Sequence, residues 1–171
     1  PDGKLVVYRV AYYSVQENKG HHMLFVSNDD GTNKKQLTTT ADNETDAAWI
    51  ENGRRIAFLT KGQLWSMNPD GSDRKQLTHS ATDIEGFKFS PDKKVILVKS
   101  IKYTGVIQAN PTDLPKATGR KVTDLMYRHW DHYVESIQHP FVADVQADGI
   151  TEGKDILEGE PYECPMEPFG G

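Results

Sequence analysis

The sequence predicts an all-β fold, and three observations carry that prediction. A segment of about 40 residues repeats along the chain, apolar and polar residues alternate within short runs, and turn-forming residues separate the runs. Residues 23–60 match residues 63–100 at a constant offset of 40, without a gap. The matched groups are Leu24-Phe25 with Leu64-Trp65, Asp30-Gly31 with Asp70-Gly71, Lys35-Gln36-Leu37-Thr38 with Lys75-Gln76-Leu77-Thr78, Trp49 with Phe89, and Ile56-Ala57-Phe58 with Ile96-Leu97-Val98.

Each repeat has the pattern of four short strands. In the second copy they are expected at 47–50, 55–60, 63–67 and 74–78, which are rich in β-branched and aromatic residues. Asn68-Pro69-Asp70-Gly71 has the residue preferences of a type I turn and separates the last two runs. Four antiparallel strands in about 40 residues are typical of one β-propeller blade. The sequence therefore predicts part of a propeller.

We expect residues 1–171 to form one propeller fragment. Its blade repeats are expected near 1–40, 41–80 and 81–157, the last with a divergent insertion at about 101–138, while 158–171 starts the next blade. The third copy is fainter, and it is indicated by the alternating run 141–145. Leu37, Leu77 and Leu157 stand at intervals of 40 and 80 residues, which supports the same assignment.

This pattern amounts to about four four-stranded antiparallel blades in an open arc, a fragment of a larger propeller. The initial Pro1-Asp2-Gly3-Lys4 resembles the internal Pro91-Asp92-Lys93-Lys94, so we interpret the chain as a piece of a longer protein. An open arc leaves two edge sheets without neighbours, and we expect the fragment to self-associate through its edge blades.

Large aromatic side chains recur at strand positions and are expected to pack between neighbouring sheets. They are Trp49, Phe58, Trp65, Phe87 and Phe89. Burying a large apolar side chain contributes roughly 1.5–3 kcal/mol to stability, and one such sheet cannot bury both its faces alone. Stacked blades supply the missing partner.

The composition narrows the classes of function. The 171 residues are 36% hydrophobic with a net charge of −5, and the mean hydropathy is −0.65. The negative charge argues against a general nucleic-acid binder, and no apolar run is long enough for a membrane span. The single Cys164 excludes an internal disulfide framework and a multi-thiolate zinc site. No signal-peptide pattern occurs in these residues.

Two signatures resemble known families. The run 68–78, followed by Phe87-Lys88-Phe89-Ser90-Pro91-Asp92, resembles the TolB-type propeller repeat. The run 125–134, with the sequence LMYRHWDHYV, is more specific. Together with 139–145 and the Gly159-Glu160-Pro161-Tyr162 loop, it resembles the N-terminal propeller of prolyl-oligopeptidase-family serine peptidases, of the dipeptidyl-peptidase and acylaminoacyl-peptidase type. This resemblance covers essentially the whole chain.

The resemblance implies a parent protein in which a propeller sits over an α/β-hydrolase domain with a Ser-Asp-His triad. The propeller would then scaffold the enzyme and restrict it to short peptides, and the parent would be exported to the periplasm or secreted. The fragment itself is expected to be non-catalytic, because a nucleophile elbow needs Gly-x-Ser-x-Gly and the only Gly-Ser here, Gly71-Ser72, lies in a hairpin turn. The resemblance assigns no cofactor.

Candidate contact residues are few. His129, Asp131 and His132 suggest a metal site, but residues three apart on one strand face opposite sides. We therefore expect Arg128, His129 and Asp131 to form a polar cluster or to contact substrate in the parent.

The acidic segment after residue 157 contains a second pair of candidates, Glu160 and Glu163. They form either a solvated connector or an acidic rim that attracts a peptide ammonium group.

A rival reading assigns the chain to a TolB-like protein-binding propeller without peptidase activity. A small independent sandwich domain is a weaker alternative, against which the constant repeat argues. A Gly-x-Ser-x-Gly elbow in the full gene would favour the peptidase.

Overall fold

The computed structural model describes residues 3–103, 107–108, 116, 121–122, 128–129 and 132–164. This part of the chain is β-structure apart from one 3-10 turn, η1 (Glu51–Gly53). The strands are β1 (Leu5–Ser14), β2 (Lys19–Asn28), β3 (Lys35–Gln36), β4 (Thr45–Ile50), β5 (Arg55–Thr60), β6 (Gln63–Met67), β7 (Lys75–Gln76), β8 (Ile84–Phe89), β9 (Lys94–Lys102), β10 (Ile107–Gln108), β11 (Lys121–Val122), β12 (Arg128–His129), β13 (His132–Tyr133), β14 (Ser136–Asp144) and β15 (Lys154–Asp155).

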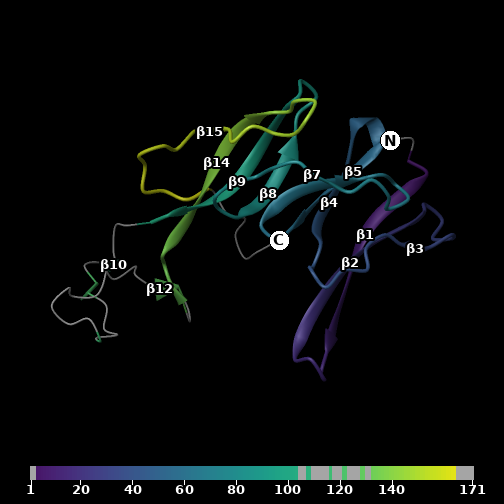
Figure 1. Ribbon diagram of the computed structural model, residues 1–171, viewed down its shortest axis with the longest axis horizontal. Helices are drawn as coiled ribbons and strands as arrows, with labels where there is room; N and C mark the ends of the chain where they lie inside the picture. The colour runs from purple at the N-terminus through teal and green to yellow at the C-terminus, as the bar shows by residue number, and fades with distance from the viewer. Residues whose placement is uncertain are drawn as a thin grey trace.

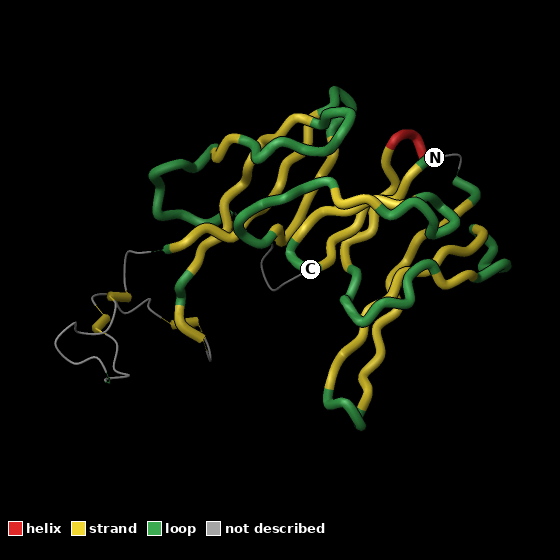
Figure 2. Tube along the Cα trace, in the orientation of Figure 1, coloured by secondary structure: helices red, strands yellow, loops and turns green. Residues whose placement is uncertain are grey.

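Three antiparallel sheets of the blade type stand side by side (Figures 1 and 2). The first has the order β1-β2-β3, the second β4-β5-β6-β7 and the third β8-β9-β14-β15. The predicted all-β partial propeller is therefore confirmed. The described residues form three such sheets, and the first of them has three strands. The short pairs β10–β11 and β12–β13 lie between β9 and β14 along the chain.

The second sheet matches the strands predicted from the repeat. β4 to β7 lie within one or two residues of the expected runs and pair in sequence order. Gly71 N donates to the Asn68 carbonyl oxygen at 2.9 Å, which closes the predicted turn. Asp70 Oδ1 accepts hydrogen bonds from the Ser72 amide and hydroxyl, and these bonds lower the pKa of Asp70.

One part of the repeat alignment is wrong. Trp49 pairs with Ile56, whereas Phe89 pairs with Val95, so Ile56 corresponds to Val95 and not to Ile96. Six residues separate Trp49 from its partner Ile56, but only five separate Phe89 from its partner Val95, so the offset after this turn is 39. Because side chains alternate along a strand, this single step exchanges the two faces. Val95 is fully buried, while Ile96 is 44% exposed.

The third copy is shifted by one residue in the same way. Leu37 N donates to Leu24 O and Leu77 N to Leu64 O, each at 2.8 Å. In the third sheet the equivalent bond runs from Ile156 N to Pro140 O, at 3.1 Å. The equivalent of the two leucines is therefore Ile156 and not Leu157.

The apolar core consists of two layers, one between each pair of neighbouring sheets. The layer between the first and second sheets contains Leu24, Val26, Ile56 and Phe58, with Trp49 and Trp65 packed against it. The layer between the second and third sheets contains, among others, Ala57, Leu64, Val95 and Leu97, with Phe87 and Phe89 packed against it. The predicted role of the aromatic residues as packing between sheets is confirmed.

Gly71, in the turn between β6 and β7, lies close to the main chain of the first sheet. A Cβ atom on Gly71 would lie 2.9 Å from the carbonyl oxygen of Leu37, and Gly71 has φ +87°. In the first sheet, Gly31 occupies the matching turn with φ +79°, but nothing lies within 4 Å of its Cβ position. The two turns thus share a backbone conformation and differ in the approach of a neighbouring sheet.

We predict that Gly71→Ala destabilises the chain more than Gly31→Ala does. The positive φ costs about 1–2 kcal/mol at either position, and the collision with the Leu37 carbonyl adds about 1–3 kcal/mol at Gly71 alone. Urea unfolding followed by circular dichroism measures both free energies. Equal losses for the two variants would show that the sheets do not approach closely at Gly71.

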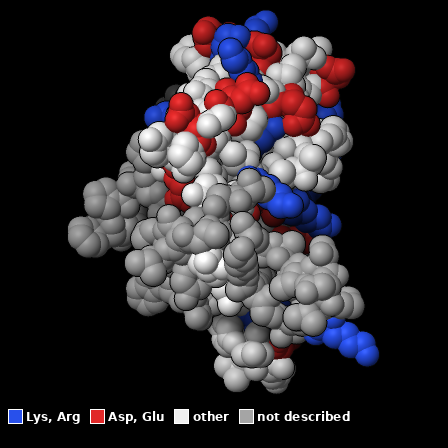
Figure 3. All heavy atoms as spheres, turned by 90° about the vertical axis from the view of Figure 1, so that its left-hand side faces the viewer, with Lys and Arg blue, Asp and Glu red and all other residues white. Residues whose placement is uncertain are grey.

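Acidic and basic side chains are interspersed over the described surface on the side drawn in Figure 3. Among the described residues, no helix has the length and apolar character needed to cross a membrane.

Candidate functional site

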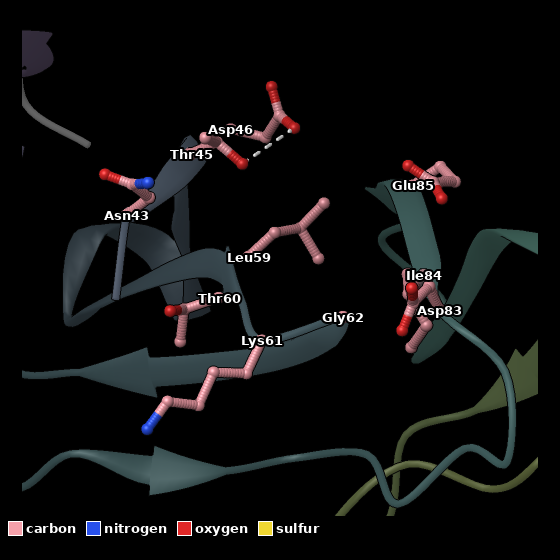
Figure 4. Close-up of a pocket in the computed structure, with 10 residues that line it drawn as sticks. All are labelled: Asn43, Thr45, Asp46, Leu59, Thr60, Lys61, Gly62, Asp83, Ile84 and Glu85. Carbon is pink, nitrogen blue, oxygen red and sulfur yellow. Dashed lines mark hydrogen bonds between the residues drawn. The ribbon is translucent and has the colours of Figure 1, made fainter. Parts of the chain in front are cut away.

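A small recess lies where the second and third sheets meet, at the first residues of β4 and β8 (Figure 4). Its volume is about 270 Å³. It is lined by Asn43, Thr45, Asp46, Leu59, Thr60, Lys61, Gly62, Asp83, Ile84 and Glu85. Both β4 and β8 have an irregular register near their first residues, between Thr45 and Ala48 and between Ile84 and Gly86. Such bulges redirect side chains, and here they do so at the recess in both sheets.

Carboxylates dominate the charge of this recess. Asp46, Asp83 and Glu85 contribute three acidic side chains, and the lining contains a single cation, Lys61. Lys61 Nζ lies 2.9 Å from Asp42 Oδ2, so a fourth carboxylate already pairs with it. Thr45 Oγ1 lies 3.4 Å from Asp46 Oδ2 (Figure 4), and Ser100 Oγ lies 3.3 Å from Glu85 Oε1. The recess therefore carries net negative charge.

Gly62 is required for the wall of the recess. It has φ +66°, and a Cβ atom there would lie 2.0 Å from Asp83 Oδ1. Its carbonyl oxygen accepts a hydrogen bond from Ile84 N at 3.0 Å, which ties the β5–β6 turn to the start of β8. The residue at position 62 thus sets how closely the two sheets approach.

The recess is suited to an electrostatic contact with a cationic group. Its volume falls slightly below the roughly 300–1,000 Å³ of common small-molecule sites. Its lining contains no histidine or cysteine that could act as a base or nucleophile. Carboxylates in a concave surface attract cationic groups.

A larger cleft of about 1,070 Å³ lies at the opposite end of the same seam. It is lined by β4, the turn before β5, β7 and the segment 145–150. Arg55 is fixed in its wall, because its guanidinium donates to Ser66 Oγ, Asn68 Oδ1 and Asp73 Oδ2 at 2.8–3.2 Å. The hydrogen bond from Arg55 lowers the pKa of Asp73. These contacts all lie within the second sheet, and they fix the Arg55 side chain in the wall of the cleft.

Two of the predicted contact residues lie in a hairpin. Arg128 and His129 form β12, which pairs with β13 so that His129 stands opposite His132. His129 and His132 therefore belong to two paired strands and not to one strand. Asp131 and the side chains of Arg128 and His129 lie outside the described residues. Among the residues that are described, no group of three or more His, Cys, Asp or Glu is arranged to hold a metal ion.

The other two predicted residues lie on an exposed loop after β15. Glu160 and Glu163 are both exposed, and Glu160 N donates to Leu157 O at 2.9 Å. The loop returns to the sheet at Cys164, whose amide donates to Gln138 O at 2.7 Å. Burial and the nearby carboxylates of Asp155 and Glu163 raise the pKa of the Cys164 thiol. That environment disfavours a reactive thiolate.

Sequence reasoning missed several buried ionisable side chains. His139 is fully buried, and its Nδ1 lies 2.8 Å from Asp155 Oδ2. Lys99 is buried next to it, with Nζ 2.7 Å from Glu152 Oε2 and 4.8 Å from the centre of the Phe141 ring. The sequence did contain a signal for the burial of Lys99, because this lysine follows Val95 and Leu97 on the same face of the strand.

The whole chain is similar to part of two curated relatives. It is 50% identical over 176 residues to dipeptidyl-peptidase 5 of Porphyromonas gingivalis, covering 100% of this chain and 26% of that relative. It is 44% identical over 173 residues to dipeptidyl-peptidase 5 of Porphyromonas endodontalis, covering 98% of this chain and 25% of the relative. The predicted resemblance to a dipeptidyl-peptidase-type propeller is confirmed. The chain spans about a quarter of the length of these relatives. No protein-family model matches it.

Solved structures agree on the fold of this dipeptidyl-peptidase-like segment. Acylaminoacyl peptidase of Pyrococcus horikoshii matches 89% of the chain, with 23% of its own length, 15% identity and a TM-score of 0.62. A putative TolB from Agrobacterium tumefaciens matches 90% of the chain, with 46% of its own length, 17% identity and a TM-score of 0.55. These likenesses support the partial propeller.

Proposed function

We propose that the chain is a non-catalytic propeller segment of an exported serine peptidase that cleaves short peptides. Its role is to scaffold an α/β-hydrolase domain and to limit the access of substrates to it. The observation that carries this proposal is the 50% identity to dipeptidyl-peptidase 5 over the full chain, combined with the blade-type sheets. The periplasmic or secreted location belongs to the same proposal and can be checked by fractionation of cells that express the full gene.

We assign the segments of this chain to blades of the parent propeller as the repeat predicts. Blades lie near 1–40, 41–80 and 81–157, with an insertion at about 101–138 and the start of another blade at 158–171. The weak candidates for structural or substrate contact are Arg128, His129, Asp131, Glu160 and Glu163. The acidic recess of Asp46, Asp83 and Glu85 adds a second surface suited to cationic groups.

Activity measurements on the chain and on its full-length parent test this proposal. We expect the isolated 171-residue chain to release no chromophore from dipeptidyl nitroanilides, while the full-length protein does so. We also expect the full-length protein to have a kcat/KM at least about tenfold lower for a 30-residue peptide with the same N-terminus than for the short substrate, because the propeller restricts the entry of the longer peptide. A tenfold difference in kcat/KM corresponds to about 1.4 kcal/mol in the activation free energy. A full-length protein without a Gly-x-Ser-x-Gly elbow or peptidase activity would instead support the TolB-like binding propeller.

Self-association through the edge sheets is a further part of the proposal. The first and third sheets each pack against a neighbour on one face, and their other faces retain exposed apolar side chains. Exposed apolar faces of this kind favour association with another sheet.

A further inference from the structure

The central hairpins of the first and third sheets are longer than that of the second sheet between them. Leu24, Leu64 and Pro140 occupy the same place in the three sheets. Beyond that place the ladder of the second sheet ends after one pair, whereas the first continues for five, to Ser14, and the third for four, to Lys102. At about 3.4 Å per residue, the two long hairpins project about 14 and 10 Å past the second sheet. Figure 1 shows the β1–β2 hairpin extending clear of the other sheets.

The acidic recess lies between the bases of these two hairpins. Asn43 lines the recess, and its Oδ1 accepts a hydrogen bond from His22 N at 2.8 Å. Asp83 also lines it, and its carbonyl oxygen accepts a hydrogen bond from Ser100 N at 3.0 Å. His22 and Ser100 are the first residues by which each long hairpin exceeds the hairpin of the second sheet. The two hairpins and the recess therefore form one continuous surface.

The β1–β2 hairpin adds exposed apolar side chains to this surface. Tyr13 lies on the same face of the hairpin as Val7, which packs against the layer between the first and second sheets. Tyr13 is nevertheless 58% exposed, because the hairpin of the second sheet ends before it reaches Tyr13, and Val15 at the tip is 84% exposed. This exposure results from the unequal lengths of neighbouring hairpins within the chain. Tyrosine side chains presented in this way are common anchors of protein interfaces.

The charge on this surface indicates the chemistry of its partner. Asp46, Asp83 and Glu85 give the recess net negative charge, and the one cation in its lining, Lys61, is paired with a further carboxylate. The cleft at the opposite end of the seam is lined by three cations and two carboxylates, and none of its lining residues is an exposed large apolar side chain. The partner of the hairpin end is therefore a basic surface that also covers Tyr13.

We propose that the catalytic domain of the parent packs on this end of the sheets, between the two long hairpins, and presents basic side chains to the acidic recess. The inference rests on the proposed function, which supplies that domain. The contact buries Tyr13 and Val15 and pairs the carboxylates of the recess. This chain covers 26% of its Porphyromonas gingivalis relative, so a protein of that length has room for a second domain.

Photo-cross-linking in the full-length protein tests this orientation. Tyr13→p-benzoylphenylalanine places a photoreactive ring on the β1–β2 hairpin, and Lys93→p-benzoylphenylalanine places the same ring at the opposite cleft. We expect irradiation to join position 13, and not position 93, to a peptide of the catalytic domain. An equal mixture of isotope-labelled and unlabelled protein shows by mass whether each link lies within one molecule. A link from position 93 alone, links only between molecules, or no link from either position overturns the proposal.

Neutralising the recess provides a second measurement in the full-length protein. The triple variant consists of Asp46→Asn, Asp83→Asn and Glu85→Gln. We expect amide hydrogens of residues 11–22 to exchange at least about twofold faster in this variant, because the ion pairs that hold the catalytic domain over the hairpin are lost. Glu51→Gln with Asp148→Asn, at the opposite cleft, is the matched control that leaves these rates unchanged. Equal exchange in the triple variant and the wild type overturns the electrostatic contact.

The two levels of the proposal fail in different ways. A full-length protein with peptidase activity but without the link from position 13 overturns the docking surface alone. A full-length protein that has neither peptidase activity nor a hydrolase domain overturns the proposed function and this inference together.

Discussion

Phe58→Ala is expected to lower the free energy of unfolding by about 3–5 kcal/mol. Phe58 is fully buried in the layer between the first two sheets, where it contacts the cluster around Leu24 and Met67. The Arg74 guanidinium lies 5.1 Å from the centre of its ring, so the substitution also removes a cation–π contact. Guanidinium chloride unfolding followed by tryptophan fluorescence measures the change.

Tyr8→Ala is the matched control for this prediction. The register places Tyr8 at the position of Phe58 in the first sheet, where no further sheet covers it among the described residues. Its ring stacks on Phe25 with centres 5.9 Å apart, and we expect its removal to cost less than about 1.5 kcal/mol. A Phe58→Ala loss no larger than the Tyr8→Ala loss would contradict the packing of the first sheet on the second. The comparison is made at a concentration where the chain is monomeric.

Much of the fold was predictable because local signals agreed with one another. The Asp-Gly turns, the alternation in the second repeat and the offset between Leu24 and Leu64 all indicate the same four-stranded unit. The structure adds a reason for the repeated glycine that the turn alone does not supply. Gly71 permits the close approach of Leu37 as well as the positive φ.

The errors in register have a simple physical origin. Ile96-Leu97-Val98 is apolar at consecutive positions, because both faces of a blade face neighbours in a propeller. Such a run matches Ile56-Ala57-Phe58 equally well after a shift of one residue, and only the length of the preceding turn decides between the alternatives. An alignment without gaps cannot detect a one-residue deletion in a turn. Such a deletion nevertheless moves every side chain of the following strand to the opposite face of the sheet.

The candidate recess could not be predicted from the sequence for a different reason. Asp46, Asp83 and Glu85 are single acidic residues separated along the chain by other kinds of side chain. They come together because β4 and β8 begin at the same end of adjacent sheets and both are bulged there. Neither the spacing nor the residue type signals that proximity.

Arg74→Met is expected to destabilise the chain by about 3–5 kcal/mol, because it leaves the buried carboxylate of Glu44 without its cation. Glu44 is fully buried, and its Oε1 accepts hydrogen bonds from Arg74 Nη2 at 3.1 Å and from Thr40 Oγ1 at 2.5 Å. Its Oε2 has no hydrogen-bond partner in the structure. The Arg74 guanidinium also lies 6.0 Å from the centre of the Trp65 ring. Urea unfolding of the single variant measures the loss.

The double variant Arg74→Met with Glu44→Leu separates the charge effect from simple loss of contact. Removing both charges eliminates the unpaired carboxylate and substitutes apolar side chains, so the double variant should be more stable than Arg74→Met alone. This order follows from desolvation, since a carboxylate that has lost its partner costs more in a buried position than an apolar group does. If the second substitution made the protein less stable still, Glu44 would be stabilising without Arg74, and the buried ion pair would not account for the effect.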